Sequence, residues 1–198
     1  VKETDDLFDT AKVLISRSLP RGPRLAVITN SGGIGIIAFD ALVEQKGRLA
    51  VLSEASMEKL DRIMPCSWSR SNPLDLSRDA DVERYAQATD VCLKDDGVDG
   101  ALIIYAPASH AAPGELAKRL VGCLSKAAKP VVAVWMGDQY SREGIEVFRE
   151  ANVPVYGTPE EAVRAYIYML KYHRGIELLY ETPEEAPENG MMLTTHLR

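Results

Sequence analysis

The sequence predicts an α/β fold with one parallel sheet whose two faces are both covered by helices. Short runs of apolar and β-branched residues alternate along the chain with amphipathic segments of helical length. The runs are apolar at almost every position, which is typical of parallel strands, because the crossover helices bury both faces of the sheet. Five such runs at this spacing fit a doubly wound, flavodoxin-like sheet. Ligands of these sheets bind beyond the carboxyl ends of the strands, near the point where the strand order reverses.

The chain opens with a predicted amphipathic helix over residues 5–18. Its apolar side chains recur at helical spacing on one face: Leu7, Phe8, Ala11, Leu14 and Ile15. Residues 19–23, Leu-Pro-Arg-Gly-Pro, then break the helix and are interpreted as a linker. Residues 1–23 are therefore expected to be an N-terminal helix and linker that precede the main domain.

Residues 24–180 form the predicted main domain, in which strands and helices alternate. The predicted strands span residues 24–29, 48–52, 100–107, 130–136 and 153–156. The predicted helices span residues 33–46, 56–65, 79–95, 112–128, 141–152 and 158–180. The segment 181–198 begins acidic and proline-rich and is expected to be a flexible acidic tail.

Local signals set the ends of two of these helices. Ser56 is the expected N-cap of the helix over 56–65, and Pro65 is its expected stop. Thr158 is the expected N-cap of the last helix. Pro159 then occupies the first helical position, and Glu161 completes a capping box with Thr158.

Composition excludes several classes of protein. The chain of 198 residues is long enough for one domain with a substantial core, and its net charge of −6 argues against nucleic acid as a partner. No run approaches the roughly 18 apolar residues of a membrane span, and no signal peptide opens the chain, so no membrane association is expected. Cys66, Cys92 and Cys123 are scattered, which favours buried thiols over a disulfide framework or a metal site. A cytoplasmic location fits this cysteine usage.

A glycine-rich junction follows the first predicted strand. Gly32 and Gly33 let a ligand approach the backbone, and the helix behind them presents unpaired N–H groups and the positive end of its dipole. Asn30 and Ser31 add side-chain donors, so the junction predicts an anion site. The spacing matches neither a dinucleotide fingerprint nor a nucleoside triphosphate loop, and a tight packing turn remains the alternative.

The helix after this junction is apolar around most of its circumference. Ile34, Ile36, Ile37, Phe39, Leu42 and Val43 leave little polar surface over its first turns. A helix of this kind is normally buried. We expect the sheet to cover one side of it and another domain to cover the other.

The loop over 67–76 is the second candidate region. Asn72 precedes Pro73 and is therefore held in an extended conformation, and Asp75 follows between two leucines. The functional interpretation places Asn72 and Asp75 beside the glycine junction, at the carboxyl edge of the sheet. The alternative is a turn in which Asp75 caps locally.

Several other polar or aromatic residues are weaker candidates. His110 follows a predicted strand and is a candidate for the same edge, whereas His173 on the last helix and His196 in the tail are interpreted as surface residues. Trp135, Met136 and Gly137 end a predicted strand at this edge, and core packing and a turn are their favoured interpretation.

The two loops together resemble the NDP-forming acyl-CoA synthetases, the ADP-forming acetate–CoA ligase group of the succinyl-CoA synthetase superfamily. The resemblance covers roughly residues 5–180. It rests on the order and spacing of RLAVITNSGGIGIIAFDAL (24–42), NPLDL (72–76), VDGALIIYAP (98–107), KPVVAVWMG (129–137) and VPVYGTPEEAVRAYIYMLKYHR (153–174). Within that family the chain looks like the flavodoxin-like CoA-ligase domain.

The resemblance implies a reversible reaction in which acyl-CoA, ADP and phosphate give the acid, CoA and ATP through a phosphohistidine. Two helix N-termini, one from each flavodoxin-like domain, hold the phosphoryl group, and the glycine junction matches one of them. The residues carried over as phosphate binders are Asn30, Ser31, Gly32, Gly33, Ile34 and Gly35, and the active-site loop residues are Asn72, Pro73 and Asp75.

The same resemblance implies that other domains supply the remaining chemistry. The phosphohistidine is expected in a CoA-binding and phosphohistidine domain and the nucleotide site in an ATP-grasp domain. CoA, ADP or ATP and Mg²⁺ are therefore expected there, and no cofactor or metal on this stretch, although phosphate or sulfate can bind it. The chain begins with Val inside an amphipathic pattern, which indicates part of a longer protein.

Two alternatives come from other functional classes. The same region occurs in bacterial protein lysine acetyltransferases as a non-catalytic regulatory module, which the sequence of the flanking domains distinguishes from a synthetase. The other is a flavodoxin-like interaction domain with no ligand of its own.

Overall fold

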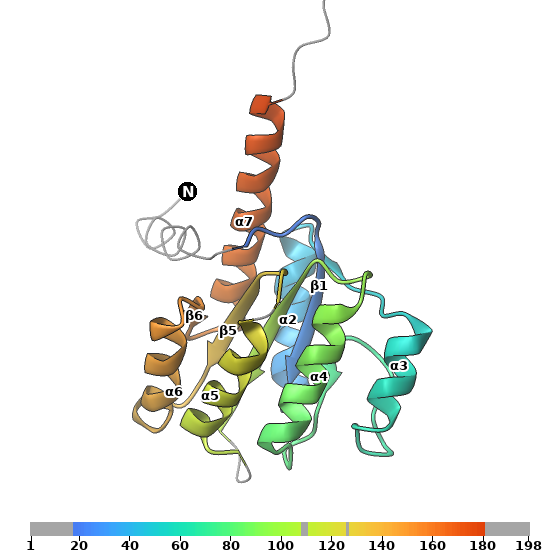
Figure 1. Ribbon diagram of the computed structural model, residues 1–198, viewed down its shortest axis with the longest axis vertical. Coiled ribbons are helices and arrows are strands. Elements are labelled where there is room, and N and C mark those ends of the chain that lie inside the picture. Colours follow the sequence, from blue (N-terminus) through green and yellow to red (C-terminus); the bar gives the residue numbers. More distant parts are fainter. Residues whose placement is uncertain (1–17, 108–110, 126, 181–198) are drawn as a thin grey trace, which may run out of the picture.

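The structure is a parallel sheet between two layers of helices (Figure 1). The computed structural model describes residues 18–107, 111–125 and 127–180. The strands are β1 (Arg24–Thr29), β2 (Arg48–Leu49), β3 (Leu74–Asp75), β4 (Gly100–Tyr105), β5 (Val131–Trp135) and β6 (Val155–Tyr156). The helices are α2 (Gly32–Glu44), α3 (Glu54–Asp61), α4 (Val82–Lys94), α5 (Pro113–Leu124), α6 (Asp138–Glu150) and α7 (Pro159–Tyr180). The predicted helix over 5–18, apart from Ser18, and the tail 181–198 lie outside the described residues.

All strand pairings in the sheet are parallel, in the order β2-β1-β4-β5-β6. This path is the flavodoxin-like order, so the predicted fold class is confirmed. A sixth strand, β3, lies within the segment 67–76 that was predicted as a loop. It pairs with Ile28 and Thr29 of β1, whereas β2 pairs only with Arg24 and Leu25. The edge of β1 is thus shared between β2 and β3, and β2 is shorter than the predicted strand over 48–52.

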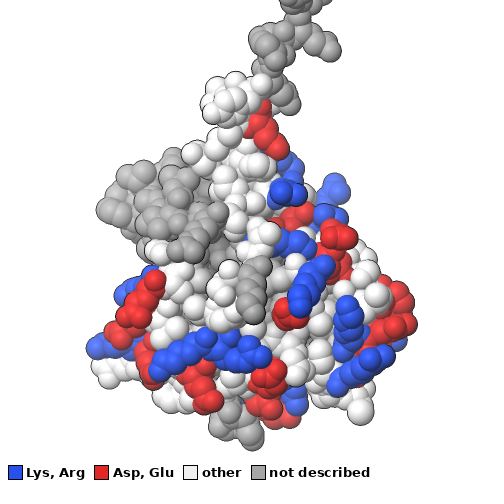
Figure 2. Space-filling view, viewed as in Figure 1, with Lys and Arg blue, Asp and Glu red and all other residues white. Residues whose placement is uncertain are grey.

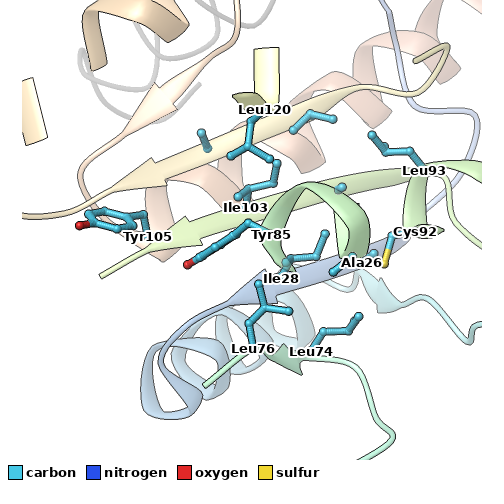
Figure 3. Close-up of a cluster of buried hydrophobic side chains, with 14 of the residues drawn as sticks. Ala26, Ile28, Leu74, Leu76, Tyr85, Cys92, Leu93, Ile103, Tyr105 and Leu120 are labelled. Carbon is cyan, nitrogen blue, oxygen red and sulfur yellow. The ribbon is translucent and has the colours of Figure 1, made fainter. Parts of the chain in front are cut away.

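The core lies in two clusters, one on each face of the sheet. On one face, α2 and α7 pack on alternate residues of β1, β4 and β5. On the other face, α3 to α6 cover the remaining residues of the same strands. Figure 3 shows part of this second cluster, where Ala26 and Ile28 of β1 lie among Tyr85, Cys92 and Ile103. Both faces of the central strands are therefore buried, as their continuous apolar sequence predicts.

Two predicted helix starts have different outcomes. The capping box of α7 is confirmed, because the Glu161 N–H donates to Thr158 Oγ1 and the Thr158 N–H donates to Glu161 Oε2, both at 3.3 Å. The predicted N-cap of α3 is wrong. Ser53 caps this helix by accepting from the backbone N–H of Ser56, so Ser56 lies in the first turn. The helix also ends at Asp61, before Pro65.

The three cysteines are free and differ in exposure. Cys92 is buried, and burial raises the pKa of its thiol to about 12. Cys123 is partly buried, and Cys66 is exposed, so the prediction of a buried thiol is wrong for Cys66. Cys66 lies in the segment after α3, where no helix or strand covers it. Among the described residues no cluster of side chains fits a metal ion, and none of the helices that the structure describes has the length and hydropathy to cross a membrane.

Asp95 is a buried carboxylate that makes stability depend on pH. Ser53 donates to it from its N–H and hydroxyl at 2.8 and 2.7 Å, and the Gly97 N–H donates at 2.7 Å. Burial alone raises the pKa of Asp95, but hydrogen bonds from Ser56, Ser53 and Gly97 outweigh it and lower the pKa from 3.8 to about 2. Because the folded-state pKa is the lower one, this stabilisation is complete above about pH 4.

We expect acid to remove the contribution of Asp95 as the pH falls from about 4 to 2. Asp95→Asn should lower the free energy of unfolding by about 2 kcal/mol at pH 7. Urea unfolding of both proteins from pH 7 to pH 2 measures the difference. The two curves should converge in acid, and a difference that stays constant down to pH 2 would contradict this assignment.

Candidate functional site

The candidate site lies where the strand order reverses, at the carboxyl ends of β1 and β4. These strands are neighbours, and their connections leave in opposite directions, to β2 on one side and to β5 on the other. Helix α2 begins directly after β1, and α5 begins at Pro113, after β4. The N-termini of both helices therefore lie at the same edge of the sheet (Figure 1), and neither N-cap side chain caps its helix.

The glycine turn, residues 30–35, presents unpaired backbone donors. Ser31 is the N-cap of α2, and the first hydrogen bond of the helix runs from the Gly35 N–H to the Ser31 carbonyl at 3.0 Å. The N–H groups of Gly32, Gly33 and Ile34 have no acceptor among the described residues, as expected for a helix start without a side-chain cap. The first turn also carries no acidic side chain. This arrangement suits an anion.

The three glycines of this turn have different surroundings. A Cβ atom on Gly35 would lie 3.1 Å from both Pro73 Cβ and Thr29 Cγ2, so glycine allows α2 to approach the loop over 72–76 closely. A Cβ atom on Gly32 would lie 2.7 Å from Asp75 Oδ2. A Cβ atom on Gly33 would have no neighbour within 4 Å, and Gly33 is exposed. Gly33 is therefore the glycine of the turn that faces open space.

Asn30 joins the ends of β1 and β4. Its Nδ2 donates to the Ala106 carbonyl at 2.8 Å, and its Oδ1 accepts from the Ala106 N–H at 2.9 Å. The residue is only 2% exposed. Asn30 thus holds the glycine turn at a fixed distance from the end of β4, and its contact with phosphate stays a prediction.

The structure brings Asp75 to the glycine turn. Asp75 Oδ1 accepts from the Ser77 N–H at 2.9 Å, while the other carboxylate oxygen lies against Gly32. Pro73 packs against Gly35 in the same way. Pro73 and Asp75 therefore lie next to the N-terminus of α2, and their role in an active site stays a prediction.

Asn72 lies elsewhere, in the gap between β1 and β2. Its Oδ1 accepts from the Val27 N–H at 2.9 Å, and its Nδ2 donates to the carbonyls of Leu25 and Ala50 at 2.9 and 3.0 Å. The peptide bond between Asn72 and Pro73 is cis. Asn72 thus supplies the hydrogen bonds that a longer β2 would make, and nothing in the local sequence indicates those partners.

The remaining candidates have different outcomes. His110 and His196 lie outside the described residues, and His173 on α7 pairs with Glu177 at 3.3 Å. Trp135 is 2% exposed and stacks on Tyr105 with ring centroids 4.9 Å apart, which supports core packing.

The outer face of α2 is apolar and exposed. Ile36, Ile37 and Val43 are 54%, 41% and 56% exposed, while Ala38 and Leu42 on the opposite face are buried. The sheet thus covers one side of α2 as predicted, and no described residue covers the other. Two cavities of about 300 and 390 Å³ are lined by residues outside the glycine turn.

Comparison with known proteins finds relatives over most of the chain. It is 29% identical over 172 residues to the 4-hydroxybutyrate–CoA ligase (ADP-forming) of Nitrosopumilus maritimus, a match over 87% of this chain. It is 27% identical over 176 residues to the alpha subunit of acetate–CoA ligase (ADP-forming) II of Pyrococcus furiosus, again over 87% of this chain. No family model matches the chain.

A solved structure has the same fold. The dinucleotide-forming acetyl-coenzyme A synthetase 1 of Ca. Korarchaeum cryptofilum, in complex with phosphate and ADP, superposes with a TM-score of 0.86 and 26% identity over 94% of this chain. The match covers 40% of that protein, 24% of the Nitrosopumilus ligase and 38% of the Pyrococcus subunit. The chain therefore spans between a quarter and two fifths of the length of these relatives.

Proposed function

We propose that this chain is a phosphate-binding domain of a ligase, because it is homologous to the NDP-forming acyl-CoA synthetases. The complete enzyme would convert acyl-CoA, ADP and phosphate to the acid, CoA and ATP. The observation that carries the proposal is the set of unpaired N–H groups on Gly32, Gly33 and Ile34, at the point where the strand order reverses. Sheets of this type bind their ligands at that point.

The glycine turn binds the phosphoryl group through backbone donors and the dipole of α2. The dipole contributes up to roughly 2 kcal/mol to an anion in a partly buried position. Because Asn30 is bonded to Ala106, these donors are already positioned before the anion arrives. Preorganised donors of this kind stabilise a transferring group without a reorganisation cost. The Asp75 carboxylate lies beside Gly32 and repels an anion there. The anion therefore approaches from the side of Gly33.

The exposed face of α2 is the contact surface for the other flavodoxin-like domain of the enzyme. Ile36 directly follows the glycine turn, and Ile37 and Val43 continue the same exposed face, so a domain that covers these residues also reaches the phosphate. That domain would supply the phosphohistidine and the second helix N-terminus, and its contact would exclude water from the site. Electrostatic interactions with the phosphate are stronger once water is excluded.

The remaining parts of the reaction belong to other domains. The relatives are about two and a half to four times as long as the part of them that this chain matches. We place CoA, the nucleotide and Mg²⁺ on a CoA-binding domain and an ATP-grasp domain of the same protein or complex. The 198-residue chain by itself is therefore expected to bind phosphate weakly and to show no ligase activity.

Phosphate titration of the isolated chain, followed by amide NMR, tests the proposal. The amides of Gly32 to Gly35 should shift with phosphate and with sulfate, and much less with chloride at equal ionic strength, because the site prefers a tetrahedral anion. If phosphate shifts other amides while those of Gly32 to Gly35 stay unchanged, the glycine turn only packs α2 on the sheet.

A further inference from the structure

The glycine turn has a hydrogen-bond acceptor beside its donors. Asp75 lies against Gly32, because a Cβ atom on Gly32 would be 2.7 Å from Asp75 Oδ2. The register of the sheet fixes this position, since Asp75 of β3 is the partner of Thr29, the last residue of β1. A carboxylate oxygen therefore lies next to the free N–H groups at the start of α2.

The fold uses one oxygen of this carboxylate and leaves the other without a donor. Asp75 Oδ1 accepts from the Ser77 N–H at 2.9 Å, which holds the side chain in the turn after β3. Oδ2 has no hydrogen-bond donor among the described residues. Arg84 is engaged elsewhere, because it pairs with Asp79 at 3.2 Å and donates to the Leu76 carbonyl at 3.0 Å. Oδ2 is thus available to a ligand.

The surroundings of Asp75 leave its charge in place. Tyr85 is near enough to interact with it electrostatically, but burial raises the pKa of Tyr85 well above its usual value, so this side chain is neutral. Arg78 is exposed, and none of the ion pairs within the described residues includes Asp75. In Figure 2 acidic and basic side chains lie next to one another, and the described part of this face has no extended positive patch. The choice of anion therefore depends on local groups.

A site with backbone donors and a carboxylate acceptor distinguishes tetrahedral anions by their protons. A carboxylate only accepts hydrogen bonds, and sulfate carries no proton at neutral pH, so the two repel each other. Inorganic phosphate keeps a proton on at least one oxygen at neutral pH. This P–OH group can donate to the carboxylate while the other oxygens accept from the backbone. A site built to bond a hydroxyl rejects an analogue that lacks it, because the polar group of the site is then left unpaired.

We propose that Asp75 is a specificity-determining residue that accepts a hydrogen bond from the P–OH group of inorganic phosphate and so selects hydrogen phosphate over sulfate. The inference rests on the proposed phosphate-binding function and adds the protonation form of the anion that enters. The P–OH group lies beside Gly32, and the unprotonated oxygens face the N–H groups of Gly33 and Ile34. Asp75 thereby also orients the bound anion.

Titration of the full 198-residue chain with phosphate and with sulfate, followed by the amides of Gly32 to Gly35, tests the selection. Phosphate should bind the unmodified chain about tenfold more tightly than sulfate at pH 7 and constant ionic strength. Asp75→Asn should lower this ratio to about one, chiefly because sulfate binds more tightly once the charge is removed. Asparagine keeps an oxygen that can accept from the Ser77 N–H, so the turn after β3 is retained.

Two further variants separate the carboxylate from other effects. Gly32→Ala keeps the backbone N–H, but its Cβ would lie 2.7 Å from Asp75 Oδ2 and displace the carboxylate, so it should lower the ratio as Asp75→Asn does. Asp79→Asn removes the same charge from an exposed carboxylate of the same loop and should leave the ratio unchanged. The amides of β4 report whether each variant is folded.

Four outcomes would overturn the inference. Equal affinities for phosphate and sulfate in the unmodified chain would show that the carboxylate does not select, while the phosphate-binding function would stand. A preference for phosphate that persists in Asp75→Asn would assign the selection to another group. A response of the glycine amides in Asp75→Asn alone would show that the carboxylate itself occupies the start of α2. No response in either chain would overturn the proposed function together with this inference.

Discussion

Gly33→Pro is expected to abolish the phosphate response of the glycine turn while the domain stays folded. Proline removes the backbone N–H of residue 33, which lies between the other two free donors. The first turn of a helix tolerates proline, and this N–H has no partner in the fold that would be lost. In the full-length ligase that we propose, the loss of one preorganised donor should lower the turnover number by about 100-fold or more. Amide NMR titration and steady-state kinetics measure the two effects.

Gly33→Ala is the matched control for this substitution. Alanine keeps the N–H, and its Cβ meets no atom within 4 Å. Alanine also favours a helix over glycine by about 0.5–1 kcal/mol, so stability should be unchanged or slightly higher. If Gly33→Ala and Gly33→Pro reduce turnover equally, the backbone donor is not the group that binds phosphate. If CoA binding by the full-length enzyme also falls in Gly33→Pro, the effect is misfolding.

Asn72→Leu is expected to give the largest loss of stability. The leucine side chain has the same branching and number of heavy atoms but leaves the Val27 N–H and the carbonyls of Leu25 and Ala50 without their partners. Each backbone group that loses its partner in a partly buried position costs about 1 kcal/mol, so we expect a loss of about 3 kcal/mol in the free energy of unfolding. Urea denaturation measures this difference.

The neighbouring exposed Ser71 provides the control. Ser71→Ala removes a hydroxyl whose partner among the described residues is the exposed Ser69 side chain, and should change stability by less than about 0.5 kcal/mol. If Asn72→Leu costs no more than Ser71→Ala, water satisfies the three backbone groups, and Asn72 does not hold β1 and β2 together.

The amino-acid sequence by itself determined the features that depend on neighbouring residues. The alternation of apolar strands and amphipathic helices determined the fold class, because burial on both faces of a sheet requires continuous apolar runs. The capping box of α7 follows from Thr158 and Glu161, which are three residues apart. The glycine turn was also visible in the sequence, because a strand that ends in small residues before an apolar helix leaves free N–H groups whatever surrounds it. The prediction of Ser56 as a cap was wrong because Ser53, three residues earlier, is the N-cap and is also a serine that fits the local pattern.

The tertiary structure alone decided what each candidate residue does. Asn30 and Asn72 both looked like ligand donors, yet they bond to Ala106, 76 residues away, and to Val27, 45 residues away. Strand β3 pairs with Ile28 and Thr29 of β1, beyond the residues of β1 that β2 pairs with. Gly33 differs from Gly32 only because Asp75 arrives beside one and not the other. In each case a partner distant in sequence satisfies or blocks a polar group, and a local pattern carries no information about which distant group that is.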